Sequence, residues 1–185
     1  MNKIKIFFIV EIAFLIASCG HETQSNQQGA ITKDSVRRQS ITQIKKWEAE
    51  MHKSMELNNV TAGLAIKSYN DFVKAFPDDS LCPDFLFKAG EIATATKQYP
   101  QSLMYYKNIT DKYPNYKNYT ASLYLQGFLL DNYLNDDAKA KVIYEEVIAK
   151  YPTTIYADNA KMAIRNLGKS DDELIKEFKK KNGQK

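Results

Sequence analysis

The sequence predicts an all-α fold, an antiparallel helix-pair solenoid of about three repeats followed by a C-terminal capping helix. One short phrase occurs three times, as YNDFVKAFP at residues 69–77, YKNITDKYP at 106–114 and YEEVIAKYP at 144–152. Each copy ends in an aromatic residue and a proline, which a helix cannot pass. The three closing prolines are 37 and 38 residues apart, a period typical of stacked helix pairs.

Composition agrees with a helical globular body. A chain of 185 residues with 44% hydrophobic and 26% charged residues is expected to form one folded domain. Glycine is scarce, with 7 residues, which favours long helices. The net charge of +4 includes 22 acidic residues, so we expect no nucleic-acid partner.

The N-terminus combines basic residues, a short apolar run and small residues in front of a cysteine. Lys3 and Lys5 precede an apolar run at residues 6–16, which is shorter than the roughly 20 residues that span a membrane. Small residues and then Cys19 follow, in the string LIASCG. This order resembles a lipobox, and the resemblance implies that residues 1–18 are a signal peptide and that Cys19 is lipidated. The alternative is a buried N-terminal helix with an ordinary cysteine.

Residues 19–35 are polar and lack aromatic side chains, so we expect a flexible tether after the lipidated Cys19. The solenoid domain is then expected over residues 36–185. Gly20, and not an aspartate, follows the cysteine. By resemblance to enterobacterial sorting, this implies anchoring in the outer membrane on its periplasmic face, with exposure at the cell surface left open.

Helical spacing of apolar residues, together with turn and capping signals, locates the individual helices. Ser170 and Glu173 have the form of a capping box that opens the last helix. The expected helices cover approximately residues 34–57, 61–76, 83–97, 100–113, 119–134, 136–151, 157–167 and 170–181.

Small residues, an aromatic and a proline recur in a fixed order within each unit. The matching positions are Ala65, Tyr69 and Pro77; Gly90, Ser102, Tyr106 and Pro114; and Gly127, Ala140, Tyr144 and Pro152. In this pattern residues 45–168 resemble the tetratricopeptide repeat (TPR) family. A small residue lets two backbones approach while the aromatic fills the space beside them. The resemblance implies that alanine is accepted at Gly127.

A lipobox followed by such repeats resembles two kinds of envelope protein. One is the β-barrel assembly lipoprotein BamD, and the other is the Tol–Pal-associated protein YbgF. The aromatic–proline phrases beginning at Phe76 and Tyr151 carry this resemblance. It implies a periplasmic scaffold for protein–protein interaction, as in outer-membrane protein assembly. The alternative is an accessory ligand- or peptide-binding lipoprotein of an uptake or Tol–Pal-type system.

The TPR resemblance places a partner-binding groove on the first helix of each pair. We expect it to hold an envelope protein or an extended peptide, because aromatic residues interspersed with carboxylates suit such ligands. The alternative is that several of these residues belong to the core. The expected groove residues are Trp47, Phe87, Glu91, Tyr124, Phe128, Asp131 and Asn132, joined by Met162 and Asn166 from the last unit.

No residue pattern indicates catalysis, a metal site or a cofactor, and we expect a protein that is not an enzyme. His52 is interpreted as a surface residue and Cys82 as a packed thiol. The lysines at 176, 179, 180, 181 and 185 admit two interpretations. They could contact anionic lipid headgroups, but the preferred interpretation is that cations are favoured in a last helical turn.

Overall fold

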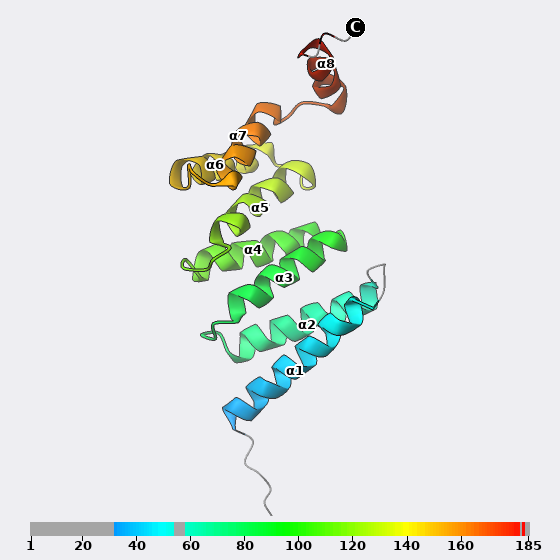
Figure 1. The fold of residues 1–185 in the computed structure, drawn as a ribbon, viewed down its shortest axis with the longest axis vertical. Helices are drawn as coiled ribbons and strands as arrows, with labels where there is room; N and C mark the ends of the chain where they lie inside the picture. The colour runs from blue at the N-terminus through cyan, green and yellow to red at the C-terminus, as the bar shows by residue number, and fades with distance from the viewer. Residues whose placement is uncertain (1–31, 54–57, 182, 184–185) are drawn as a thin grey trace, which may run out of the picture. The chain divides into compact units, whose positions relative to one another are not determined.

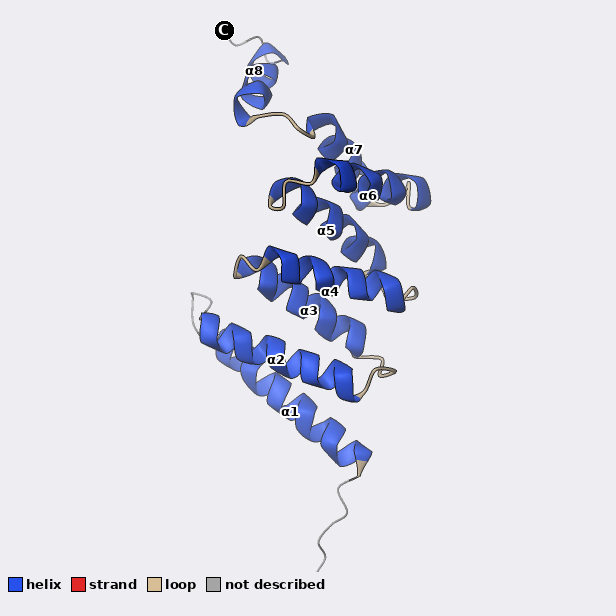
Figure 2. Cartoon of the chain, turned by 180° about the vertical axis from the view of Figure 1, so that it is seen from behind, coloured by secondary structure: helices blue, strands red, loops and turns tan. Residues whose placement is uncertain are grey.

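The computed structural model describes residues 32–53, 58–181 and 183, and these form eight helices with no strand. This confirms the predicted all-α, TPR-like solenoid. Figure 1 labels each helix, and Figure 2 shows the same succession from behind. The helices are α1 (Lys33–Met51), α2 (Asn59–Ala75), α3 (Cys82–Ala95), α4 (Tyr99–Lys112), α5 (Tyr119–Asn132), α6 (Asp137–Lys150), α7 (Ile155–Asn166) and α8 (Asp171–Lys181).

Each helix from α1 to α7 packs mainly against its neighbours in the sequence, and α5 also contacts α7. The first pair is α1 with α2, the second α3 with α4, and the third α5 with α6 (Figure 1). α7 then packs on α6 as the first helix of a further unit, whereas α8 makes no broad contact with another helix. Contacts between sequence neighbours are the hallmark of a solenoid.

The repeated phrase ends helices as predicted. α2, α4 and α6 each stop one residue before the aromatic–proline pair. The aromatic is the C-cap, and its backbone N–H closes the last helical hydrogen bond, as in the 2.9 Å bond from Phe76 to the carbonyl of Phe72. The following proline has no N–H with which to continue that ladder.

The helix starts carry the expected caps. Asp136 accepts a hydrogen bond from the backbone N–H of Lys139 at 3.1 Å, at the start of α6. The capping box of α8 is formed, because a carboxylate oxygen of Glu173 accepts from the backbone N–H of Ser170 at 2.8 Å. The Ser170 hydroxyl accepts in return from the N–H of Glu173 at 3.4 Å.

The bounds of the first helix differ from the prediction. α1 begins at Lys33, capped by Thr32, so the last residues of the expected 19–35 tether are helical. It ends at Met51 and not near residue 57. α2 starts after its N-cap Asn58, whose side chain accepts hydrogen bonds from the backbone N–H groups of Val60 and Thr61. The expected signal peptide and Cys19 lie outside the described residues.

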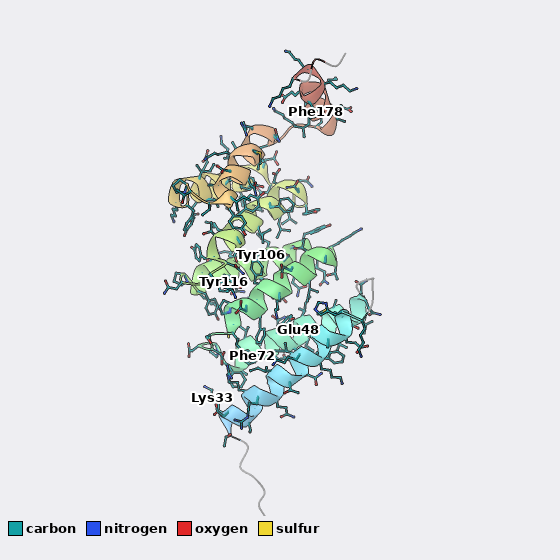
Figure 3. All side chains as sticks on the ribbon, in the orientation of Figure 1. Lys33, Glu48, Phe72, Tyr106, Tyr116 and Phe178 are labelled. Atoms are coloured by element: carbon teal, nitrogen blue, oxygen red, sulfur yellow. The ribbon has the colours of Figure 1, made fainter. Side chains whose placement is uncertain are left out.

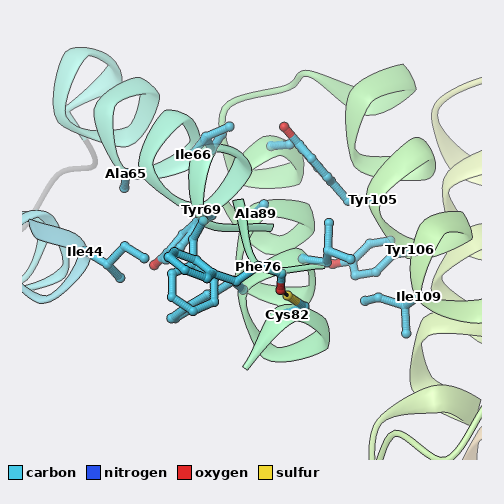
Figure 4. Packing of buried hydrophobic residues seen from close by; sticks show 14 of the residues in the cluster. Ile44, Ala65, Ile66, Tyr69, Phe76, Cys82, Ala89, Tyr105, Tyr106 and Ile109 are labelled. Atoms are coloured by element: carbon cyan, nitrogen blue, oxygen red, sulfur yellow. Dashed lines mark hydrogen bonds between the residues drawn. The ribbon is translucent and has the colours of Figure 1, made fainter. Parts of the chain in front are cut away.

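The tyrosine that opens each repeated phrase is a core residue. Tyr69, Tyr106 and Tyr144 are each 2% exposed or less. Tyr69 stacks on Phe85 of the next unit with ring centroids 5.3 Å apart, and Figure 4 shows Tyr69 and Tyr106 within the first core cluster. A second cluster surrounds Tyr144, and Leu103 of α4 packs against both clusters.

A glycine faces the tyrosine ring in the second and third units. A Cβ atom added to Gly90 would lie 2.7 Å from a Tyr106 ring carbon, and one added to Gly127 would lie 2.8 Å from a Tyr144 ring carbon. The buried hydroxyl of Ser102 donates to the carbonyl of Gly90 at 2.8 Å, which satisfies a polar group at the same crossing. The expectation that alanine is accepted at Gly127 is therefore wrong, because an added Cβ would overlap ring carbons of the buried Tyr144 and the ring or the helix would have to shift.

Gly127→Ala should lower the free energy of unfolding by about 1–3 kcal/mol through overpacking. Gly63 is the matched control, since it lies on the exposed face of α2 with nothing within 4 Å of an added Cβ. Gly63→Ala should raise stability by about 0.5–1 kcal/mol, because alanine loses less backbone entropy in a helix. Thermal melts followed by circular dichroism measure both, and equal shifts in one direction would contradict the crossing geometry.

Candidate functional site

A cavity with a volume of about 710 Å³ opens between the first helices of the third and fourth units. α5 and α7 supply most of its wall, α6 supplies Tyr144, and the segment from Gly168 to Leu174 closes one side. We call it the α5–α7 cavity. Its lining residues are Tyr124, Phe128, Asp131, Asn132, Asn135, Tyr144, Asn159, Met162, Ala163, Asn166, Gly168, Lys169 and Leu174.

The structure brings together the groove residues predicted for the third and last units. Tyr124, Phe128, Asp131 and Asn132 lie on one side of α5, because residues three, four, seven and eight positions apart share a helix face. Met162 and Asn166, one turn apart on α7, face the same space. Asn132 and Asn166 are exposed, whereas the two aromatic residues are half-buried.

A row of aromatic rings runs along this side of the molecule. Tyr124 packs between Tyr156 of α7 and Tyr144 of α6, with centroid distances of 5.7 Å to each. Phe128 continues the row to Tyr133 at 5.8 Å. Tyr133 in turn stacks on Tyr99 at 4.0 Å with an interplanar angle of 8°. The rings therefore connect the start of α4 with α7.

Sequence reasoning missed the outer members of this row. Tyr133 is the C-cap of α5, Tyr99 is the first residue of α4, and Tyr156 is near the start of α7. All three lie at helix termini, where side-chain direction departs from the regular helical spacing that identified Tyr124 and Phe128. The surplus of tyrosine, 12 residues in the chain, was the available signal.

Asp131 connects the cavity to the core. The Tyr144 hydroxyl donates to a carboxylate oxygen of Asp131 at 3.2 Å. Burial raises the pKa of the Asp131 carboxyl and the charge of Asp137 adds to this, although the Tyr144 hydrogen bond acts in the opposite direction. Burial and the Asp131 charge also hold the pKa of Tyr144 well above the usual value for tyrosine. The tyrosine therefore stays a donor.

The groove residues predicted from the first two units lie elsewhere. Phe87 packs between Tyr106 and Tyr116, with centroid distances of 5.6 and 6.2 Å. Trp47 is half-buried against the first core cluster, with the amine of Lys46 5.2 Å from its ring centroid. Glu91 is exposed, although partial burial raises the pKa of its carboxyl. None of these three lines the α5–α7 cavity.

Glu48, labelled in Figure 3, connects helices of the first two units by hydrogen bonds. One of its carboxylate oxygens accepts from the Tyr69 hydroxyl at 2.9 Å and from the amine of Lys88 at 2.6 Å. These bonds join α1 to α2 and α3. Polar side chains of α1 and α3 thus hold helices together, whereas those of α5 and α7 line an open cavity.

The described residues hold no group of three or more His, Cys, Asp or Glu that could bind a metal ion. Cys82 is fully buried, and its thiol donates to the carbonyl of Phe76 at 3.0 Å. The thiol is therefore packed, as expected. Its burial also raises its pKa, which favours the protonated form. His52 is exposed at the C-cap of α1. No helix among residues 32–53 and 58–181 is long and apolar enough to cross a membrane.

Residues 84–116 and 121–154 match the tetratricopeptide repeat family. These segments contain most of the α3–α4 pair and most of the α5–α6 pair, the two pairs in which a glycine faces a tyrosine ring. A search of curated proteins found no match. The repeat match supports a TPR protein, and such repeats bind protein or peptide partners.

Asp131→Asn should stabilise the protein at neutral pH. The raised pKa means that the folded state binds a proton more readily than the unfolded chain, so ionisation of Asp131 weakens folding as pH rises through the raised value. The amide avoids that cost and still offers an oxygen to the Tyr144 hydroxyl. Melting temperatures measured from pH 3 to pH 8 test this. The variant should gain at neutral pH and match the wild type in acid, and a gain that persists below about pH 3, under the ordinary Asp pKa, would refute the assignment.

Proposed function

We propose that this chain is a lipid-anchored scaffold of the bacterial envelope that holds an extended segment of a partner protein in the α5–α7 cavity. The observation that carries this proposal is the convergence of Tyr124 and Phe128 from α5 with Met162 and Asn166 from α7 on one open space. The two TPR matches support the same class of function, since the family's repeats bind proteins and peptides.

The lining chemistry fits a peptide backbone. Asn132, Asn135, Asn159 and Asn166 surround the cavity, and each amide side chain both donates and accepts hydrogen bonds. A peptide backbone offers the complementary carbonyl and N–H groups. Partly buried aromatic rings beside these amides supply apolar contact area, and aromatic residues commonly carry much of the binding energy of an interface. A segment without regular structure has both features available along its length.

The lipobox-like string at Cys19 supports the proposed anchor, and Gly20 after it supports transfer to the outer membrane. Two or more acyl chains give stable anchoring. With such an anchor, a BamD-like part in outer-membrane protein assembly is the first candidate. The amide-rich lining of the cavity also favours a second, an accessory ligand- or peptide-binding lipoprotein of an uptake or Tol–Pal-type system. Co-purification from envelopes in mild detergent separates them by the identity of the captured protein.

The first test places bulk and charge in the cavity without removing core contacts. Tyr124 is unsuitable for truncation because its ring packs on the buried Tyr144. Asn132→Arg and Asn166→Arg change exposed lining residues of α5 and α7. We expect each to reduce co-purification of the envelope partner at least tenfold, about 1.4 kcal/mol, with an unchanged circular-dichroism spectrum.

Val142→Arg is the matched control, since Val142 is 63% exposed on α6 and does not line the cavity. This variant adds the same charge and bulk to the exposed side of α6, the second helix of its pair, and should leave co-purification of the partner unchanged. If Val142→Arg abolishes capture while both cavity variants retain it, the partner binds through the second-helix side and the proposed site is wrong.

The second test concerns the anchor. Cys19→Ser removes the thiol to which the lipid would be attached, so the variant should lose incorporation of a fatty-acid analogue and leave the membrane fraction. Cys82→Ser is the control, because Cys82 is buried in the core and is not available for acylation. Wild-type protein that remains unlabelled at full precursor mass would rule out the lipoprotein proposal.

A further inference from the structure

α8 is an amphipathic helix with lysines gathered toward its C-terminal end and with two of its three apolar side chains exposed. Leu174, Ile175 and Phe178 share one face of its eleven residues. Ile175 is 51% exposed and Phe178 is 64% exposed, and Figure 3 shows Phe178 projecting from the helix. The last two turns also hold the lysines at 176, 179, 180 and 181. Apolar side chains are thus presented to solvent beside a dense group of cations.

The surface next to α8 continues this pattern. A groove of about 1020 Å³ lies between α7 and α8, and we call it the α7–α8 groove. Met162 of α7, 48% exposed, adds to its apolar wall. Its charged lining residues are Arg165, Lys169, Glu177, Lys179 and Lys181. Capping of the solenoid end by α8 was the expected role, but the structure leaves the apolar side chains of the helix exposed.

The charges of α8 are separated along the helix, since Asp171, Asp172 and Glu173 occupy its first turn and Lys179, Lys180 and Lys181 its last. Glu173 is engaged in the capping box with Ser170, and Glu177 pairs with Lys169 at 2.8 Å. Among the side chains that the structure describes, no ion pair involves the lysines at 176, 179, 180 or 181. Within the described residues, no ion pair therefore offsets the positive charge at the C-terminal end of α8, although the helix as a whole holds four acidic and four basic residues.

We propose that α8 docks on the surface of an anionic phospholipid bilayer. Ile175 and Phe178 enter the boundary between headgroups and acyl chains, and the lysines contact the headgroups. A helix with a strong apolar–polar asymmetry, low overall hydrophobicity and a lysine-rich polar face has the features of an interfacial helix. Each lysine near an anionic surface strengthens binding by about fivefold. The α7–α8 groove shares Met162 and Leu174 with the α5–α7 cavity, but the docking rests on Ile175, Phe178 and the lysines of α8, which do not line that cavity.

A bilayer fits this surface better than a protein partner does. Stable protein interfaces use about 20–30 residues on each side, whereas α8 has eleven residues and three apolar ones. A second copy of the chain would also bring the same cations together. A membrane surface needs no matching shape, and its negative charge complements the lysine group.

A fluorescent probe on α8 tests this docking in the full chain. Trp47 is the only tryptophan in the sequence, so Trp47→Phe combined with Phe178→Trp places the sole indole on α8. Vesicles of phosphatidylcholine mixed with phosphatidylglycerol should shift its emission to shorter wavelength. Vesicles of phosphatidylcholine alone should give no shift, and high salt should reverse the shift because it screens the headgroup charge. The N-terminal segment cannot imitate this result, since the indole reports its own surroundings.

Replacing the four lysines at 176, 179, 180 and 181 with glutamine on the same background should weaken vesicle binding at least about 100-fold. Glutamine has a helix propensity similar to that of lysine, so α8 should remain helical. The same probe at Met104, an exposed residue of α4, should give no shift. An absent shift with anionic vesicles, an equal shift with neutral ones, or a shift that appears only when envelope proteins are added would overturn the proposal.

Discussion

The close contact between a glycine and a tyrosine ring fixes the distance between the two helices of the second and third units. Gly90 lies against Tyr106, and Gly127 lies against Tyr144, at separations that leave no room for a Cβ atom. The rings are buried, so neither helix moves apart or slides without opening the core. Because each pair packs on the next, an error at one crossing displaces the elements on both sides.

That contact also positions the α5–α7 cavity. Tyr144 fills the space beside Gly127 with its ring and donates to Asp131 with its hydroxyl. The same side chain therefore holds α6 against α5 and fixes the orientation of a lining carboxylate. Tyr124 packs against the ring of Tyr144, so the same core residue also fixes the position of Tyr124. The lining is thus pre-organised by packing, which lowers the ordering cost of the proposed peptide binding.

The helices and their ends were predictable because their signals are local. The aromatic–proline pair that closes each repeated phrase stops its helix, and Ser170 with Glu173 caps one through residues three apart in the chain. Helical spacing also identified Tyr124 and Phe128 as sharing a face. It did not show that Tyr116 and Tyr106 cover Phe87, because the periodicity of a helix reveals which side is apolar but not which side chains lie opposite. Contacts between residues far apart in the sequence decide whether an aromatic residue on the first helix of a pair packs in the core or lines the cavity.

Leu103 packs against both core clusters and lies between the N-terminal pairs and the cavity. Coupling in a linear array passes only between adjacent units, so α1 and α2 affect the cavity through α3, α4 and this boundary. In the proposed scaffold, α1 and α2 therefore add length more than affinity. Gain or loss of a repeat at that end would change the distance from Thr32 to the cavity and leave the lining of the cavity unchanged.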